Sequence, residues 1–321
     1  MKRSWERWLR TWLVREPGTT QAVFRILVGA CVVYAITSVL LHGDRIPLWY
    51  DRPDGGYSRM TNPPWLVMLL GGPHPMQVNL LVASTIACGL LLMLGMGGRW
   101  TALVGVWLYD NTTSLRGDAA GSYDPLITNA LFLVFLSGAT HTLSLPCKMR
   151  TGRWTSDELI PAWPRYLAIY QQVLMYAATG VQKVSETWVP GGDHSAVYYI
   201  LQQPTWHARD MSWIANYYPL TQVMSALSWT FEVGSPLLLI WLFFHRTKDR
   251  PGRVRALFNR VPYRHIFAAS GIGLHLGILA SMEVDPFCYM AISFYVNLIR
   301  PEEWGPLLKW RPRLATTAAK S

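Results

Sequence analysis

The sequence predicts an all-α integral membrane protein, a bundle of about eight transmembrane helices. Of 321 residues, 51% are hydrophobic and only 15% are charged, which is too little charge to cover a soluble protein of this length. The apolar residues also come in blocks, and a bilayer needs about 20 residues per crossing helix. The expected spans are Ala22–Leu41, Met76–Met96, Trp100–Leu115, Asp124–Leu145, Tyr166–Lys183, Thr221–Phe244, Ile266–Met282 and Pro286–Ile299.

The placement of the positive charge predicts the orientation of these spans. The net charge is +10. With eight spans, 22 of the 29 lysines and arginines fall in the termini and the connections on one side, against five on the other. This asymmetry is typical of the positive-inside rule and puts both termini in the cytoplasm. The basic balance therefore indicates a lipid bilayer with anionic headgroups as partner, and no nucleic acid.

The termini predict short segments outside the bundle. At the start of the chain, tryptophans and leucines recur at helical spacing with arginines between them, which predicts an interfacial amphipathic helix within residues 1–20. A membrane domain of residues 21–305 and a cytoplasmic tail of residues 306–321 follow. No small-x-small cleavage site follows the first span, so we expect that span to be retained.

Two long outer connections, 41–75 and 184–220, are rich in Gly, Pro and aromatic residues. This composition predicts a cap of turns and amphipathic aromatic pieces at headgroup level. The four cysteines form no CxxC pattern, so we expect neither a disulfide framework nor a metal site.

Ionisable residues inside the spans are the candidate functional groups, because they are costly in a bilayer. For Arg25, near the cytoplasmic end of the first span, we expect snorkelling to the headgroups. Glu232 shares one helical face with three serines, so this face should point into the bundle, either for function or as a hydrogen-bonded tie between helices. The three serines are Ser225, Ser228 and Ser235.

His275 and Asp124 have structural explanations beside functional ones. His275 lies among Gly271, Gly273 and Gly277, which predicts close helix approach and a neutral imidazole with one interhelical hydrogen bond. Asp124 precedes a proline at the outer start of the fourth span, where a carboxylate commonly caps a helix.

Lys183 is the sharpest candidate. Gln172, Tyr176 and Thr179 precede it by 11, 7 and 4 residues, so they form one polar stripe on its helix. Such a stripe needs protein or water partners and predicts a polar interior below the lysine. A lysine at the outer end of a span can also simply snorkel, but a partly desolvated lysine can act as a base.

The stretch QQVLMYAATGVQKVSETWVPGGDHSAVYYIL, 171–201, resembles the signature of the horizontally transferred transmembrane (HTTM) family of vitamin K-dependent gamma-carboxylase-like membrane proteins. Segments such as AVFRILVG, GRWTALVGVWLYD and TFEVGSPLLL extend the resemblance in matching order over roughly residues 22–304. The matching positions of the signature are Gln171, Tyr176, Gly180, Lys183, Trp188, Gly191 and Tyr198–Tyr199.

The resemblance implies a quinol-linked enzyme. In the carboxylase, a lysine in this motif is understood to deprotonate vitamin K hydroquinone; oxygen then yields the epoxide and a strong base that prepares a glutamate side chain for CO2. Lys183 occupies that position, at the outward side of a bacterial cytoplasmic membrane. The implied supporting polar groups are Asp124, Glu232 and His275, and a reduced naphthoquinone is expected at Gln172, Tyr176 and Trp188.

The chain also departs from the carboxylase. The stretch before the fourth span, GDAAGSYDPL, has no counterpart of the carboxylase histidine, and we expect no large lumenal substrate-binding domain. Peptide gamma-carboxylation is therefore not expected. We expect instead quinol chemistry on another peptide or small molecule. The alternatives are a membrane component for maturation of, or immunity to, a secreted peptide without quinol chemistry, and a non-enzymatic bundle.

Overall fold

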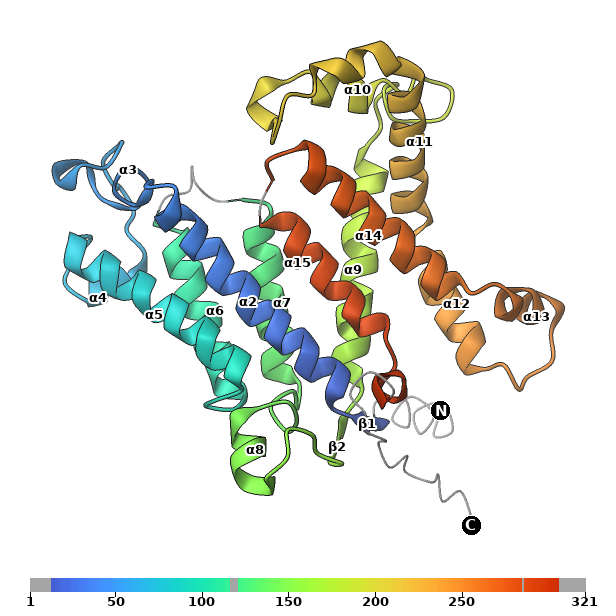
Figure 1. Cartoon of the computed structure of the whole chain (residues 1–321), viewed down its shortest axis with the longest axis horizontal. Helices are drawn as coiled ribbons and strands as arrows, with labels where there is room; N and C mark the ends of the chain where they lie inside the picture. Colours follow the sequence, from blue (N-terminus) through green and yellow to red (C-terminus); the bar gives the residue numbers. More distant parts are fainter. Residues whose placement is uncertain (1–12, 116–120, 285, 306–321) are drawn as a thin grey trace, which may run out of the picture. The chain divides into compact units, whose positions relative to one another are not determined.

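The computed structural model describes residues 13–115, 121–284 and 286–305 (Figure 1). The chain divides into two compact units, Met1–Ala168 with Ile299–Ser321, and Ile169–Leu298. Both units are mostly helical with almost no sheet, which confirms the all-α prediction. The stretch predicted as one membrane domain, 21–305, is divided between them.

The first unit is built on α2 and α5, with α6 and α7 packed beside them (Figure 1). Gly29 and Gly89 let α2 and α5 approach closely, since a Cβ on Gly29 would lie 2.7 Å from the Gly89 carbonyl oxygen. Its elements are β1 (Arg15–Pro17), α2 (Thr19–Leu41), α3 (Arg45–Trp49), η1 (Arg52–Asp54), α4 (Trp65–Leu69), α5 (Pro75–Leu94), α6 (Arg99–Thr113), α7 (Tyr123–Leu136), α8 (Leu145–Thr151), β2 (Leu159–Pro161) and η6 (Pro301–Glu303).

The described part of the N-terminal segment differs from the predicted interfacial helix. Residues 1–12 lie outside the described residues, but β1 is a strand and pairs antiparallel with β2, with Glu16 opposite Ile160. Glu16 also accepts two hydrogen bonds of 2.7 Å from the guanidinium of Arg165, and both side chains are buried. This bidentate ion pair fixes an extended segment, so the predicted interfacial helix does not extend over Arg15–Pro17.

Helix α7 ends nine residues earlier than the predicted fourth span. Ser137 has an extended backbone, and its hydroxyl donates to the Val134 carbonyl and accepts from the Ala139 amide. These local bonds replace helical ones. A Cβ on Gly138 would lie 2.7 Å from Ile160, so the chain leaves the helix where only glycine fits.

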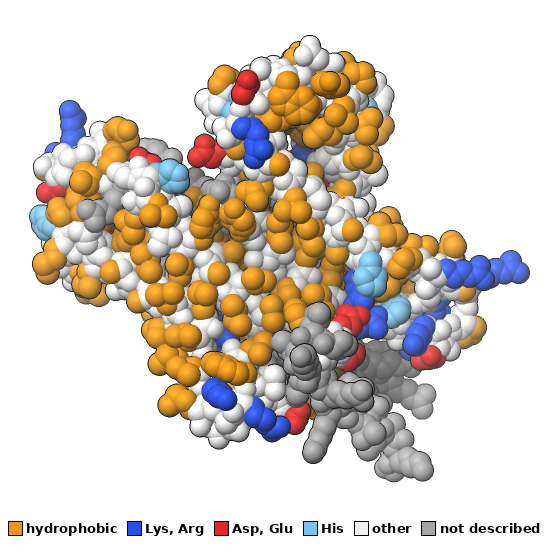
Figure 2. Space-filling view, viewed as in Figure 1, with side chains coloured by type: hydrophobic (Ala, Val, Ile, Leu, Met, Phe, Trp, Pro, Cys, Tyr) orange, Lys and Arg blue, Asp and Glu red, His pale blue; other side chains and the backbone are white. Residues whose placement is uncertain are grey.

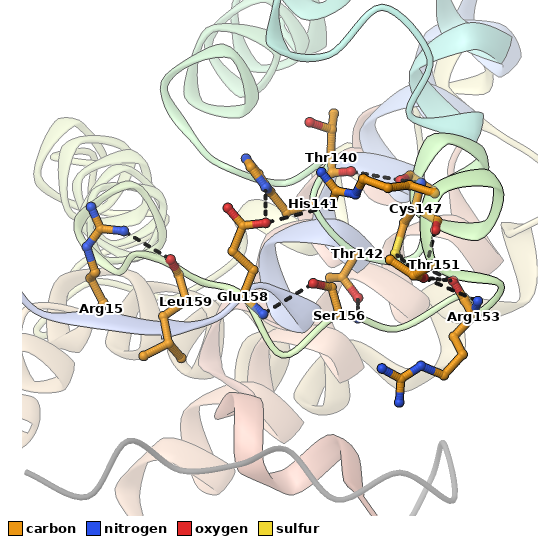
Figure 3. Close-up of polar contacts among 12 residues, drawn as sticks. Arg15, Thr140, His141, Thr142, Cys147, Thr151, Arg153, Ser156, Glu158 and Leu159 are labelled. Carbon is orange, nitrogen blue, oxygen red and sulfur yellow. Dashed lines mark hydrogen bonds and ion pairs between the residues drawn. The ribbon is translucent and has the colours of Figure 1, made fainter.

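The connection from α7 to β2 is an ordered loop held by side chains (Figure 3). Ser156 donates its amide to the Thr142 hydroxyl at 3.1 Å, and His141 Nδ1 lies 2.8 Å from Glu158. The Ser144 hydroxyl caps α8 by accepting from the Cys147 amide. The loop is therefore part of the packed first unit.

The second unit contains the remaining helices. Its elements are α9 (Trp163–Gln182), whose first residues belong to the first unit, α10 (Ala196–Leu201), η3 (Pro204–Trp206), η4 (Ser212–Tyr217), α11 (Tyr218–Gly234), α12 (Leu237–Arg246), α13 (Arg253–Arg260), α14 (Tyr263–Ser281), α15 (Phe287–Phe294) and η5 (Tyr295–Leu298).

The predicted sixth span is two helices, because α11 and α12 are separated at Ser235 and Pro236. A proline has no amide hydrogen to continue the helical ladder, and the segments 212–234 and 237–246 meet at 46°. The Ser235 hydroxyl donates to the Val173 carbonyl of α9 at 3.2 Å, which holds the break against its neighbour.

By length and apolar composition, two described helices can cross a membrane, namely α2 and α5, and the bent α11–α12 pair would make a third. Apolar side chains cover much of the helical surface on the face shown in Figure 2. These features agree with a membrane protein, since a bilayer-facing surface must be apolar.

Candidate functional site

The polar stripe of α9 is only partly as predicted. Gln172 and Tyr176 are buried, but Thr179 is exposed and its hydroxyl donates to carbonyls of its own helix. Lys183 follows the last residue of α9, so its side chain is anchored at a helix end. The stripe therefore consists of two buried groups and a lysine.

The polar face of α11 is confirmed as an inward face, because Glu232 and the three serines Ser225, Ser228 and Ser235 are all buried. Glu232 packs over Gly180 of α9. A Cβ on Gly180 would lie 2.9 Å from Glu232 Cβ and 2.8 Å from the Val233 amide nitrogen. The glycine thus lets the two helices approach closely enough for Glu232 to meet Lys183.

Lys183 and Glu232 form an ion pair in which Nζ lies 2.7 Å from each carboxylate oxygen. The lysine side chain is 22% exposed and the glutamate side chain 10%. Oε1 accepts the hydrogen bond of good geometry, and Oε2 lies as close to Nζ but without one. The pair is therefore partly desolvated, and Oε2 keeps lone-pair capacity for a further donor.

The ring of Trp188 covers the other side of the lysine, with Nζ 4.0 Å from the ring centroid. This distance is well within the range of a cation–π contact. The Trp188 carbonyl accepts a 2.9 Å hydrogen bond from His194 Nδ1. Farther along the loop, hydrogen bonds from Ser195 to the exposed carboxylate of Asp193 hold the pKa of Asp193 below its ordinary value. The hydrogen bond from His194 thus helps to position the tryptophan.

A second, uncharged group lies deeper in the second unit. Tyr176 Oη lies 2.7 Å from His275 Nε2 and 2.8 Å from Tyr295 Oη, and all three side chains are buried. The interhelical hydrogen bond predicted for His275 is confirmed. We call Gln172, Tyr176, His275 and Tyr295 the neutral cluster.

The neutral cluster has unused hydrogen-bonding capacity. Gln172 is 0% exposed, yet neither its amide nitrogen nor its oxygen has a partner of good geometry in the described chain, although it lies beside the hydroxyls of Tyr176 and Tyr295. His275 Nδ1 is likewise buried without a partner. Buried polar atoms nearly always have hydrogen bonds, so these exceptions require an explanation.

Of the three glycines near His275, Gly271 alone makes room for the neutral cluster. A Cβ on Gly271 would overlap the Tyr295 hydroxyl, whereas nothing lies within 4 Å of a Cβ on Gly273 or Gly277. The predicted close approach thus depends on one glycine of the three.

We expect Gly271→Ala to lower the free energy of unfolding by about 1–3 kcal/mol, because Tyr295 must move out of a packed position. Gly273→Ala is the matched control and should be neutral or stabilising by up to about 1 kcal/mol, because alanine favours the helix. Denaturation of the purified variants in mixed micelles measures both. Equal stabilities would contradict the overlap.

Asp124 belongs to the first unit. Its Oδ1 accepts from the Tyr109 hydroxyl at 2.7 Å, and its Oδ2 accepts from the Gly121 amide at 2.8 Å. Gly121 precedes α7, whose N-cap residue is Ser122 and has no side-chain cap, so Asp124 fastens the turn before the helix and the predicted capping of α7 is not seen. Within its unit this buried carboxylate is already paired with Tyr109.

The prediction for Arg25 was wrong, and Tyr295 was missed. Arg25 is 0% exposed and donates to the carbonyls of Met93, Ala139 and Leu143 at 2.6–3.2 Å, instead of reaching the headgroups. Its acceptors are backbone atoms distant in sequence, which no sequence pattern indicates. Tyr295 is one of 15 tyrosines, and no spacing distinguishes it.

Comparison with protein-family models, with curated proteins and with solved structures finds no match for this chain. The resemblance to the HTTM family therefore remains a prediction from the residues that carry it.

Proposed function

We propose that this protein is an integral membrane enzyme in which the Lys183–Glu232 pair takes a proton from a lipid-soluble quinol at the outer face. The observation that carries the proposal is the position of Nζ, held 2.7 Å from a desolvated carboxylate and 4.0 Å from the face of Trp188. Partly buried charge pairs beside an aromatic surface are typical of functional sites.

The geometry favours the pair, not the lysine alone, as the base. An ammonium group paired with a carboxylate carries all three of its protons and has no lone pair to accept another. The oxygen with lone-pair capacity is Oε2 of Glu232, which lies 2.7 Å from Nζ without a hydrogen bond of good geometry. In this proposal Glu232 receives the proton, while the charge of Lys183 stabilises the oxyanion that the substrate becomes.

A reduced naphthoquinone fits the Lys183 end of the site. Trp188 offers an aromatic face, and the partly exposed lysine is accessible to a hydroxyl. When bound, such a quinol would supply an acidic hydroxyl and two electrons for oxygen. Gln172 precedes Lys183 by 11 residues, about 16 Å along a helix, which exceeds the length of a bicyclic ring. Gln172 and Tyr176 therefore have a different role from Trp188.

We also propose the topology that the charge asymmetry predicts. The chain would cross a bacterial cytoplasmic membrane eight times, with both termini in the cytoplasm and Lys183 at the outer face. Each predicted span overlaps one helix or two consecutive helices. Among the described residues, two of these helices meet the length and apolarity of a full crossing. Single cysteines in the 184–220 loop should then react with a membrane-impermeant thiol reagent added from outside.

Oxygen uptake and epoxide formation by the purified protein given a reduced naphthoquinol test the activity. Wild type should turn over, and Lys183→Ala should not. A folded wild type without turnover would contradict quinol chemistry. The aromatic outer loop, with Trp206, Trp213 and Tyr217 exposed, would then be assayed for binding of a secreted peptide.

A further inference from the structure

The neutral cluster is a chain of groups that each accept and donate. A hydroxyl has one hydrogen, so if Tyr176 donates to His275 Nε2, Tyr295 must donate to Tyr176, and Nδ1 then carries an unpaired hydrogen. Reversing every bond gives the opposite polarity and leaves Nδ1 as an unpaired acceptor. In both arrangements one end of the chain is open at Nδ1, and the other ends beside Gln172.

These open ends need small polar partners. The buried atoms without a well-directed hydrogen bond are His275 Nδ1 and the two amide atoms of Gln172, which lie beside the hydroxyls of Tyr176 and Tyr295. Leaving such atoms buried and unpaired costs about 1–3 kcal/mol each. A water molecule, which makes two to four hydrogen bonds, is the ligand that matches a mixed set of donors and acceptors.

The neutral cluster and the Lys183–Glu232 ion pair follow one another along the same face of α9. Glu232 packs over Gly180, Tyr176 lies four residues before Gly180, and Gln172 four residues before Tyr176. Each step is about one helical turn, roughly 6 Å along α9, which one bridging water can span. Phe231, beside Glu232, contacts the Tyr176 ring with centroids 5.0 Å apart, so α11 follows this face of α9.

We propose that Gln172, Tyr176, His275 and Tyr295 bind internal water and, with it, form a proton path that leads from Glu232 to His275 within the second unit. A proton placed on Glu232 passes to a bridging water. Each hydroxyl or ring nitrogen along the path then accepts a proton from one neighbour and gives its own proton to the next. Only O–H and N–H bonds form and break. The inference rests on the proposed function, because that reaction supplies the proton.

X-ray footprinting of the purified protein in H2¹⁸O tests the water, because radicals formed from a bound water label only adjacent side chains. Tyr176 and Tyr295 should acquire ¹⁸O although they are only 3% and 4% exposed. Tyr109, 0% exposed and bonded to Asp124, is the internal control and should remain unlabelled. Gln172→Leu should abolish the labelling, and Thr179→Val, on the same helix, should leave it unchanged.

Naphthoquinol-dependent oxygen uptake in H2O and D2O tests the path. We expect Gln172→Leu to lower the rate at least about tenfold and to change the solvent isotope effect, while Thr179→Val keeps both. Unlabelled tyrosines would overturn the inference, as would a normal rate and isotope effect in Gln172→Leu. Labelled tyrosines in a wild type without turnover would overturn the proposed function and the path together, and leave only a water site.

Discussion

Arg25→Met should lower the free energy of unfolding by about 3–5 kcal/mol, because three buried or partly buried carbonyl groups lose a charged donor. These are the carbonyls of Met93, Ala139 and Leu143. Met93 lies at the end of α5, where carbonyls have no helical donor, and the other two belong to the ordered loop after α7. Arg25 thus joins α2 to the end of α5 and to the loop after α7 within the first unit. Denaturation of the purified variants in mixed micelles measures its contribution to stability.

Arg99→Met is the matched control, since Arg99 is exposed at the first turn of α6. It should change stability by no more than about 0.5 kcal/mol, as surface substitutions usually do. Arg25→Lys should fall between, because an ammonium cannot reproduce the planar fork that reaches three acceptors. If Arg25→Met were as stable as Arg99→Met, the guanidinium would have no structural role.

Removing one member of the Lys183–Glu232 pair should cost about 3 kcal/mol, because the other charge is left partly buried and unpaired. Lys183→Met should be the more damaging single change, since Glu232 is the less exposed partner. The double variant with methionine at both positions should be nearly as stable as wild type, because an apolar pair of similar volume often replaces a buried ion pair without loss. Unfolding of all four proteins gives the coupling energy.

This cycle separates function from stability. Recovery in the double variant means that the pair is not needed for folding, which leaves chemistry as the reason for a charge pair at this position. Additive losses, with no recovery, would mean that each side chain stabilises the fold separately and that the two charges do not couple. Single variants within about 0.5 kcal/mol of wild type would show a solvated pair that does not couple.

Periodicity in the sequence was enough to predict the helical class and the inward faces. The serine and glutamate positions of α11 and the buried Tyr176 and Gln172 follow from 3.6-residue spacing, which is a local property. Thr179 has the same spacing but is exposed, because a threonine hydroxyl can bond to its own helix and need not be buried.

The partners of these residues could not be predicted from spacing. Lys183 and Glu232 are 49 residues apart and Tyr176 and Tyr295 are 119 apart, so their contacts depend on tertiary packing. The close approach of α9 and α11 depends on Gly180, and the space for the Tyr295 hydroxyl depends on Gly271. A glycine in a sequence does not indicate which side chain will occupy the space beside it. The early end of α7 and the break before α12 arise from local serine and proline chemistry that an apolar window overlooks.

The central claim is that Glu232, held by Lys183, accepts the proton of a quinol. The most direct test is the rate of naphthoquinol-dependent oxygen uptake by Glu232→Gln, which keeps the shape of the side chain and removes its ability to take a proton. The account predicts a folded protein whose rate falls at least about 100-fold, the usual contribution of a general base. A Glu232→Gln variant that oxidises the quinol at the wild-type rate would contradict it.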